Sequence, residues 1–181
     1  MSIPDLWMPI LVSSAIVWIF SALVWMVFPW HKSDFAKTGD EEAVRAALKG
    51  LGPGFYNVPH CADQKELKQA EMQRKFEEGP AAFITVVPKG LPQMGGKLLA
   101  SFAYYVFVGI LCAYFVTRTT GSDATYLQVF RVAGAVAFIA YGVAYIQDSV
   151  WFGRPVSITM KSLLDALLYG LLTGGTFGWL A

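Results

Sequence analysis

The sequence predicts an all-α transmembrane fold: a four-helix membrane bundle with a small α+β insertion between its first and second helices. Hydrophobic residues make up 55% of the chain and charged residues only 15%, whereas soluble domains average about 25% charged residues. The charges are also segregated. Nine of the 14 basic and nine of the 13 acidic residues lie between Lys32 and Pro92. The rest of the chain therefore consists of long apolar runs.

The first apolar run, residues 6–30, contains no charged side chain. A helix over residues 6–28 would rise about 34 Å, enough to cross a hydrocarbon core of about 30 Å. Trp7 and Trp30 lie near its ends, where indole rings favour the headgroup region. No Lys or Arg precedes the run and no small-residue cleavage site follows it. A transmembrane helix is therefore predicted rather than a cleaved signal peptide.

Three further runs predict the remaining helices over residues 98–117, 124–147 and 162–181. The third helix contains Arg131 near its start and the fourth contains Asp165. Both helices are still long enough to span if these charged side chains lie at the membrane interface.

The placement of Lys and Arg predicts the orientation of the bundle. Cytoplasmic loops carry an excess of these residues close to membrane ends. One side has all of the following: Lys32, Lys37, Lys89, Lys97, Arg154 and Lys161. The opposite side has only Arg118 and Arg131. Both chain ends are therefore predicted outside, with residues 31–97 in the cytoplasm.

Within residues 31–97 the sequence predicts two helices and two strands. Thr38–Glu41 and Asp63–Glu66 have the spacing of capping boxes that open helices. Residues 55–58 and 82–87 are aromatic or β-branched runs closed by proline, as in short strands. Two short strands are marginal alone, so this segment is expected to contact the membrane surface or a partner protein.

Three motifs resemble an uncharacterised family of small bacterial four-helix inner-membrane proteins. They are Phe28-Pro-Trp-His-Lys-Ser-Asp34, the pair Gly79-Pro80, and the ending Asp165-Ala-Leu-Leu-Tyr-Gly-Leu-Leu-Thr-Gly-Gly-Thr-Phe-Gly-Trp179. The resemblance covers nearly the whole chain and implies a bacterial inner (cytoplasmic) membrane location. It implies no activity and no substrate.

The histidines and cysteines do not predict a cofactor or a metal site. A haem held by two histidines needs both on spanning helices at matching depth, but His31 lies at the interface and His60 in the polar segment. His31 is predicted to be an interfacial residue and His60 a surface residue. Cys61 and Cys112 are expected at different depths, so no disulfide is predicted.

Asp165 is the candidate intramembrane acid, and three interpretations are open. The spacing of Ser162 to Asp165 favours a capping role in the first helical turn. A helix that starts earlier would place Lys161 one turn from Asp165 as a partner. A carboxylate inside a membrane helix also indicates ion or proton transport.

Two other charged groups are expected to pair. Arg131 is predicted to pair with Asp123 or Asp5, and Asp148 with Arg154 in the loop after the third helix. Each pair is expected to hold helices together rather than to bind a ligand.

Gly170, Gly174 and Gly178 recur every four residues on one face of the fourth helix. Because lipid does not drive helices together by apolar burial, small residues that allow close backbone approach favour packing there. The third helix has small residues of its own: Ala133, Gly134, Ala137, Ala140, Gly142 and Ala144. A close crossing of helices three and four is therefore predicted, although the same face could serve a homo-oligomer.

The sequence contains no P-loop, GxSxG, HExxH or dinucleotide motif, so an enzyme is unsupported. The polar segment has no net charge, so a nucleic-acid face is not predicted. The leading hypothesis is a structural or accessory membrane protein that contacts a membrane-protein partner or the lipid bilayer. The alternatives are a small oligomeric transporter or channel using Asp165 and, more weakly, a subunit of a membrane redox or enzyme complex.

Overall fold

The computed structural model describes residues 2–181, which divide into two compact units. The helical unit comprises Met1–Ala36 and Gln93–Ala181, and the small unit comprises Lys37–Pro92. Each unit has its own internal packing.

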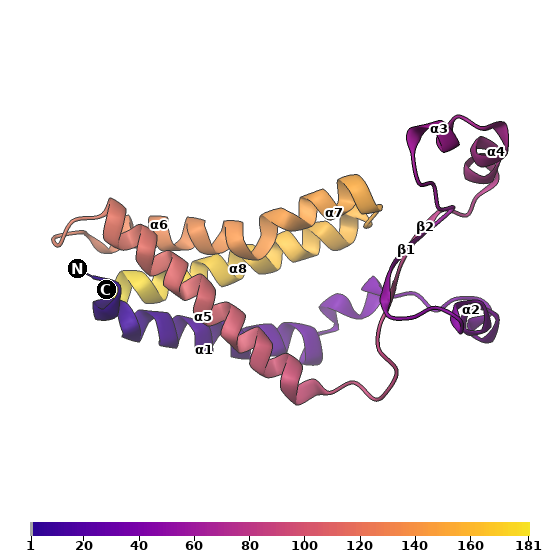
Figure 1. Ribbon diagram of the computed structural model, residues 1–181. Helices are drawn as coiled ribbons and strands as arrows, with labels where there is room; N and C mark the ends of the chain where they lie inside the picture. Colours follow the sequence, from indigo (N-terminus) through magenta and orange to yellow (C-terminus); the bar gives the residue numbers. More distant parts are fainter. Residues whose placement is uncertain (1) are drawn as a thin grey trace. The chain divides into compact units, whose positions relative to one another are not determined.

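The helical unit contains four helical segments that are long and apolar enough to cross a membrane: Pro4–Val27, Met94–Thr119, Tyr126–Phe152 and Val156–Leu180. These segments lie side by side (Figure 1). Their principal helices are α1 (Trp7–Ala22), α5 (Met94–Thr119), α6 (Tyr126–Phe138), α7 (Ala144–Phe152) and α8 (Val156–Leu180). A π-helical turn, Ile139–Val143, joins α6 to α7. The prediction of a helical bundle with four candidate spans is confirmed.

The helix starts differ from the predicted ones. The second span begins at Met94 rather than at residue 98, and the fourth begins at Val156 rather than at residue 162. Gly153 ends α7 with a φ of 66°, which glycine adopts readily, and Pro155 occupies the position before α8. These two residues set the start of the fourth helix, so the predicted cap at Ser162 is wrong. Asp165 lies in the third turn of α8.

The closest helix packing joins α6 to α8, at the glycines of the fourth span. A methyl group on Gly170 would lie 3.0 Å from the Gly134 carbonyl oxygen, and one on Gly174 would lie 2.8 Å from that of Phe130. A methyl group on Gly178 would lie 2.8 Å from the Tyr126 ring. Only glycine fits at these positions without a shift of the neighbouring helix.

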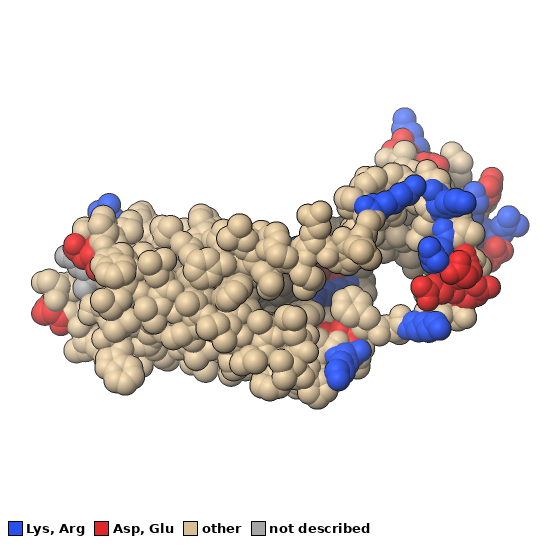
Figure 2. Space-filling model, turned by 90° about the horizontal axis from the view of Figure 1, so that it is seen from below, with Lys and Arg blue, Asp and Glu red and all other residues tan. Residues whose placement is uncertain are grey.

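Apolar side chains from all four spans form one core. Its fully buried members include Val17, Val108, Val116, Ala133 and Phe177. The long side of the helical unit has almost no charged side chains on its surface (Figure 2). This distribution is typical of a chain that faces lipid.

The small unit contains three helices and a two-stranded sheet: α2 (Glu41–Leu48), β1 (Gly54–Val58), α3 (Gln64–Leu67), α4 (Ala70–Glu78) and β2 (Ala82–Val86). The strands are antiparallel, with Gly54 opposite Val86. Of residues 37–92, only Met72 is buried.

The capping signals of the small unit are partly as predicted. Asp63 caps α3 by accepting hydrogen bonds from the amides of Lys65 and Glu66. The cap of α2 is Asp40, which accepts from Ala43, and not Thr38. The helix expected after Asp63 is interrupted at Gln69, whose ψ of 135° is extended.

Candidate functional site

The candidate site lies where the chain leaves the first span. A π-helical turn, Leu23–Val27, follows α1, and Phe28 is extended with a ψ of 146°. Pro29 then opens a short 3-10 helix, Pro29–Asp34, since its fixed φ suits a first helical position. This segment lies against α8 and contributes His31 and Asp34 to the site.

His31 is at the centre of the site and is only 4% exposed. Its Nε2 lies 2.7 Å from Oδ2 of Asp165, and its Nδ1 lies 2.5 Å from Oδ2 of Asp34. The sequence predicted His31 only as an interfacial residue and did not predict these two carboxyl partners. Both ring nitrogens are used in bonds to carboxyl groups, so neither offers a lone pair to a metal ion in this arrangement.

Lys161 completes a group that we call the charged cluster: His31, Asp34, Lys161 and Asp165. The Lys161 ammonium donates to Oδ1 of Asp34 at 2.6 Å, to the Trp30 carbonyl at 2.8 Å and to the Ser33 hydroxyl at 2.9 Å. Lys161 was predicted to be a possible partner of Asp165 one turn away. It bonds to Asp34 instead, and the partner of Asp165 is His31.

The charges of the cluster cancel. If both carboxyl groups are ionised, His31 must carry a proton on each ring nitrogen to donate to both of them. The positive charges of His31 and Lys161 then balance the negative charges of Asp34 and Asp165. If the proton between His31 and Asp165 moves to Asp165, both of these groups become neutral and the net charge of the cluster is unchanged. The cluster can thus hold one shared proton in two positions without acquiring net charge.

Asp34, like His31, lies outside the candidate spans. Burial by itself raises the pKa of this carboxyl. The hydrogen bonds from Lys161 and His31, and their positive charges, outweigh burial and hold the pKa of Asp34 below its ordinary value. Asp34 is therefore held in its ionised form.

Aromatic rings enclose the cluster. The Trp25 ring stacks on His31 with a centroid separation of 3.8 Å and an angle of 5° between the planes. The Trp30 ring meets His31 edge-on at 6.4 Å and lies 5.8 Å from the Lys161 ammonium. These rings help to keep water from His31, which is only 4% exposed.

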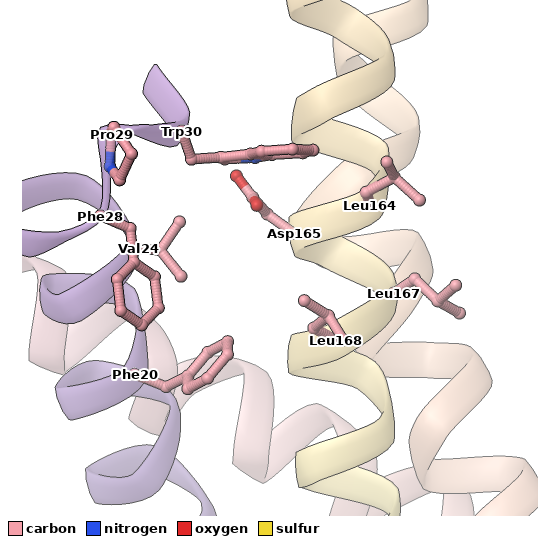
Figure 3. A pocket seen from close by; sticks show the side chains of 9 residues that line it. All are labelled: Phe20, Val24, Phe28, Pro29, Trp30, Leu164, Asp165, Leu167 and Leu168. Atoms are coloured by element: carbon pink, nitrogen blue, oxygen red, sulfur yellow. The ribbon is translucent and has the colours of Figure 1, made fainter. Parts of the chain in front are cut away.

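A cavity of about 650 Å³ adjoins the cluster. We call it the Trp30 pocket, and Figure 3 shows its nine lining side chains. They are Phe20, Val24, Phe28, Pro29 and Trp30 from the first span and its extension, and Leu164, Asp165, Leu167 and Leu168 from α8. Asp165 is the only ionisable residue in this lining. Its carboxyl lies beneath the Trp30 ring and faces the space between the two segments (Figure 3).

A second polar contact holds the loop between α7 and α8. Arg154 Nη1 lies 3.6 Å from Oδ2 of Asp148, so the predicted pair is confirmed. The same guanidinium donates to the Ser162 hydroxyl at 2.9 Å and lies 4.4 Å from the Tyr145 ring centroid. These contacts lie within the helical unit. They engage Arg154, which does not line the Trp30 pocket.

Arg131 is on the exposed side of α6. None of the ion pairs formed by residues 2–181 includes it, so the predicted pairing with Asp123 or Asp5 is wrong. Asp5 instead accepts a hydrogen bond from the backbone amide of Ser2 at 2.7 Å. This local bond engages one of the two carboxyl groups with which Arg131 was predicted to pair.

The remaining histidine and the cysteines lie apart from the charged cluster. His60 is exposed on the small unit, as predicted, with Nδ1 2.8 Å from the Asn57 side-chain oxygen. Cys61 and Cys112 are both free thiols, and Cys112 is buried in the helical core. The prediction of no disulfide is confirmed.

The small unit has a groove of about 1140 Å³ between α2 with its following loop and the end of β2. Its charged lining residues are Glu42, Arg45, Lys49 and Lys89, which sum to two positive charges. Val87, which also lines it, is 70% exposed. The groove therefore combines apolar surface with a positive rim.

The sequence contained weak signals for the charged cluster. His31 and Asp34 are three residues apart after Pro29, and Lys161 and Asp165 are four apart in an apolar helix. Each pair indicates a local contact, but nothing in a single sequence relates one pair to the other. Trp30 was expected only as an interfacial side chain, and no role was predicted for Trp25.

Comparisons of the chain with protein-family models, with curated proteins and with solved structures give no match. The resemblance to small bacterial inner-membrane proteins therefore stays a prediction. The structure establishes two units, four candidate spans and the geometry of the charged cluster.

Proposed function

We propose that the chain is a multi-pass membrane protein with an accessory role, and that its small unit docks on a partner protein. The observation that carries this proposal is the missing core of the small unit. Only Met72 is buried there, while apolar side chains such as Val58, Val87 and Leu91 are 50%, 70% and 92% exposed.

A unit of this kind gains little stability from its own burial. Chains of about 60 residues bury only about 60% of the surface that they expose when unfolded, and a two-stranded sheet needs a further packing surface. A partner that covers the apolar face of the small unit would provide this surface. Lipid headgroups are the alternative to a partner protein on this face. Hydrogen exchange with a nanodisc control distinguishes the two.

The groove indicates the chemistry of the partner. Its rim carries Arg45, Lys49 and Lys89 against the single acid Glu42, which favours a partner segment with acidic side chains. The sheet has two strands, so each strand has an edge to which an extended segment can add. We therefore propose an extended, acidic segment of a membrane-associated protein as the occupant.

The proposed location follows from the flanking charges. The positive-inside rule supports an orientation with both chain ends outside and the small unit in the cytoplasm, and the family resemblance supports a bacterial inner membrane. In this orientation the small unit would meet cytoplasmic segments of its partner.

Hydrogen exchange of the small unit tests the proposal. The amides of Phe55–Val58 and Phe83–Thr85 are expected to exchange slowly in native membranes and at least tenfold faster in the purified protein. Lipid nanodiscs that contain only the purified chain are the matched control. Equal exchange in native membranes and in the purified protein would refute docking, and slow exchange in nanodiscs would assign the cover to lipid.

Charge reversal tests the groove. A photoreactive residue at Val87 should give a discrete cross-linked product in intact cells, whereas one at Gln73 on α4 should not. The double change Lys49→Glu and Lys89→Glu should remove the product at Val87. A product that survives this reversal would show that the positive rim does not select the partner.

One observation favours transport as a second candidate function. Asp165 is 5% exposed within an apolar span and lies 2.7 Å from His31 Nε2, and intramembrane acids often bind transported ions or protons. Proton or cation flux in proteoliposomes that is lost in Asp165→Asn, with the variant still folded, would support this function over the accessory one.

A further inference from the structure

The Trp30 pocket carries an inference that goes beyond partner docking and rests on the helical unit alone. We propose that this pocket binds a membrane-soluble alcohol: a molecule with an apolar chain or ring and one neutral hydroxyl group that donates a hydrogen bond to Asp165. Four features of the pocket lead to this ligand class.

The first feature is the size and the lining of the pocket. Its volume of about 650 Å³ lies within the range of about 300–1,000 Å³ that is typical of small-molecule sites. Eight of the nine lining side chains are aliphatic, aromatic or proline, and three of them are the aromatic rings of Phe20, Phe28 and Trp30. Such walls fit a hydrocarbon chain or a flat ring.

The second feature is the access to the pocket. Phe28, Leu164 and Leu168 line it and are 47%, 46% and 43% exposed on the apolar surface of the helical unit. If these spans cross a membrane, this surface faces lipid, so a ligand enters from the bilayer and not from water. This route selects a molecule that is itself dissolved in the membrane.

The third feature is the hydrogen-bonding capacity of Asp165. Its Oδ2 is bound to His31 Nε2 and the Trp30 side chain is a further hydrogen-bond partner, but a carboxylate has about four acceptor positions on its two oxygens, so others remain open. If the shared proton moves from His31 to Asp165, it lies on the bonded oxygen Oδ2, and Oδ1 remains an acceptor. In both arrangements the carboxyl can therefore accept a hydrogen bond from a ligand.

The fourth feature is the charge balance of the cluster. Lys161 and the shared proton cancel Asp34 and Asp165 in either arrangement, so no net charge remains to hold an ionic head group. Removing an ammonium or carboxylate head from water without a compensating charge is costly. A neutral donor loses far less on transfer, which selects a hydroxyl group over a charged one.

A series of twelve-carbon ligands tests these features in phosphatidylcholine nanodiscs. The probe is a dodecanol with a photoreactive diazirine on its chain, and labelled peptides are identified by mass spectrometry. Labelling should concentrate on residues 20–30 and 164–168. Labelling spread evenly over all lipid-facing helices would show ordinary bilayer contact and would overturn the proposal.

Competition by unlabelled ligands then tests the head group. Dodecanol should reduce labelling at a concentration about tenfold lower than dodecyl methyl ether, because only the alcohol can donate to a carboxyl. Dodecylamine and laurate should compete no better than the ether. Equal competition by alcohol and ether, or stronger competition by either ion, would overturn the assignment of a neutral donor.

Two substitutions place the site. Leu168→Trp fills the pocket and should abolish specific labelling, whereas Leu171→Trp, on an exposed α8 position outside the pocket, should preserve it. Equal labelling in these two variants would overturn the location. The ligand series uses the unaltered chain, so its result stands even if the small unit has no protein partner.

Discussion

His31 Nε2 lies 2.7 Å from Asp165 Oδ2, although 134 positions of sequence separate the two residues. This bond joins the segment after the first span to the third turn of α8. Replacing such a pair with apolar residues is often neutral, whereas removing one partner leaves a buried charge. We therefore expect the bond to determine which helices are neighbours more than to raise overall stability.

Removal of the Asp165 charge should destabilise the helical unit. An Asp165→Asn variant leaves His31 without its charged partner, at a cost on the order of 3 kcal/mol, which is typical of a broken buried pair. The lower cost expected for a helix cap does not apply, because α8 begins at Val156. Thermal unfolding in detergent measures the change.

A double-mutant cycle separates this pair from its surroundings. His31→Gln combined with Asp165→Asn should cost clearly less than the sum of the two single changes, because the two groups interact directly. Asp148→Asn, whose side chain is 45% exposed, serves as the control and should change stability by less than about 1 kcal/mol. Additive single effects would argue against a direct His31–Asp165 interaction.

The stability of the helical unit should fall in acid because of Asp34. Its pKa in the folded protein lies below the ordinary value of about 3.9. The stabilisation is therefore complete above about pH 4 and is lost as the pH falls through the folded pKa. Melting temperatures between pH 7 and pH 3 measure this loss.

The donor that lowers this pKa can be removed. In Lys161→Met the pKa of Asp34 should rise, so the acid-dependent loss of stability should begin at a higher pH than in the unaltered chain. Lys97→Met, a lysine at the start of α5 outside the charged cluster, should retain the original profile. Identical profiles for both variants would contradict the role of Lys161.

Neighbouring glycines in α8 should respond in opposite ways to alanine. A methyl group on Gly174 would lie 2.8 Å from the Phe130 carbonyl oxygen, whereas one on Gly175 meets nothing closer than 3.7 Å. Gly174→Ala should therefore push α6 away and lower the melting temperature. Gly175→Ala should be neutral or stabilising by up to about 1 kcal/mol, because alanine favours helix. Equal effects from both changes would contradict the close crossing of α6 and α8.

Cysteine labelling from outside the cell tests the proposed orientation. After Cys61→Ser removes the native thiol of the small unit, a cysteine introduced at Ser122 should react with a membrane-impermeant reagent. A cysteine at Gln69 should react only after the membrane is permeabilised. The reverse pattern would invert the topology and place the small unit outside.

The spans could be predicted because long apolar runs have few other uses in a protein. The start of α8 could not be predicted from the Ser162–Asp165 spacing. Gly153 ends α7 and Pro155 precedes α8, so the helix begins at Val156, before Ser162 is reached. The charged cluster was missed for a different reason. His31 and Asp165 come into contact only after the bundle forms. The two local pairs in the sequence do not indicate that these two residues lie at the same depth in the bundle.

The π-helical turn at Leu23–Val27 has a consequence for the length of the first span. Such a turn accommodates one residue more than a regular helix. Deleting one residue within this turn would convert it to regular α-helix and change the direction of the chain that follows only slightly, whereas deleting one residue within regular α1 would rotate that chain by about 100° about the helix axis. After a deletion in regular α1, His31 would face away from α8 and the Trp30 pocket would lose one wall. The first span should therefore tolerate a one-residue deletion within Leu23–Val27 far better than one within α1.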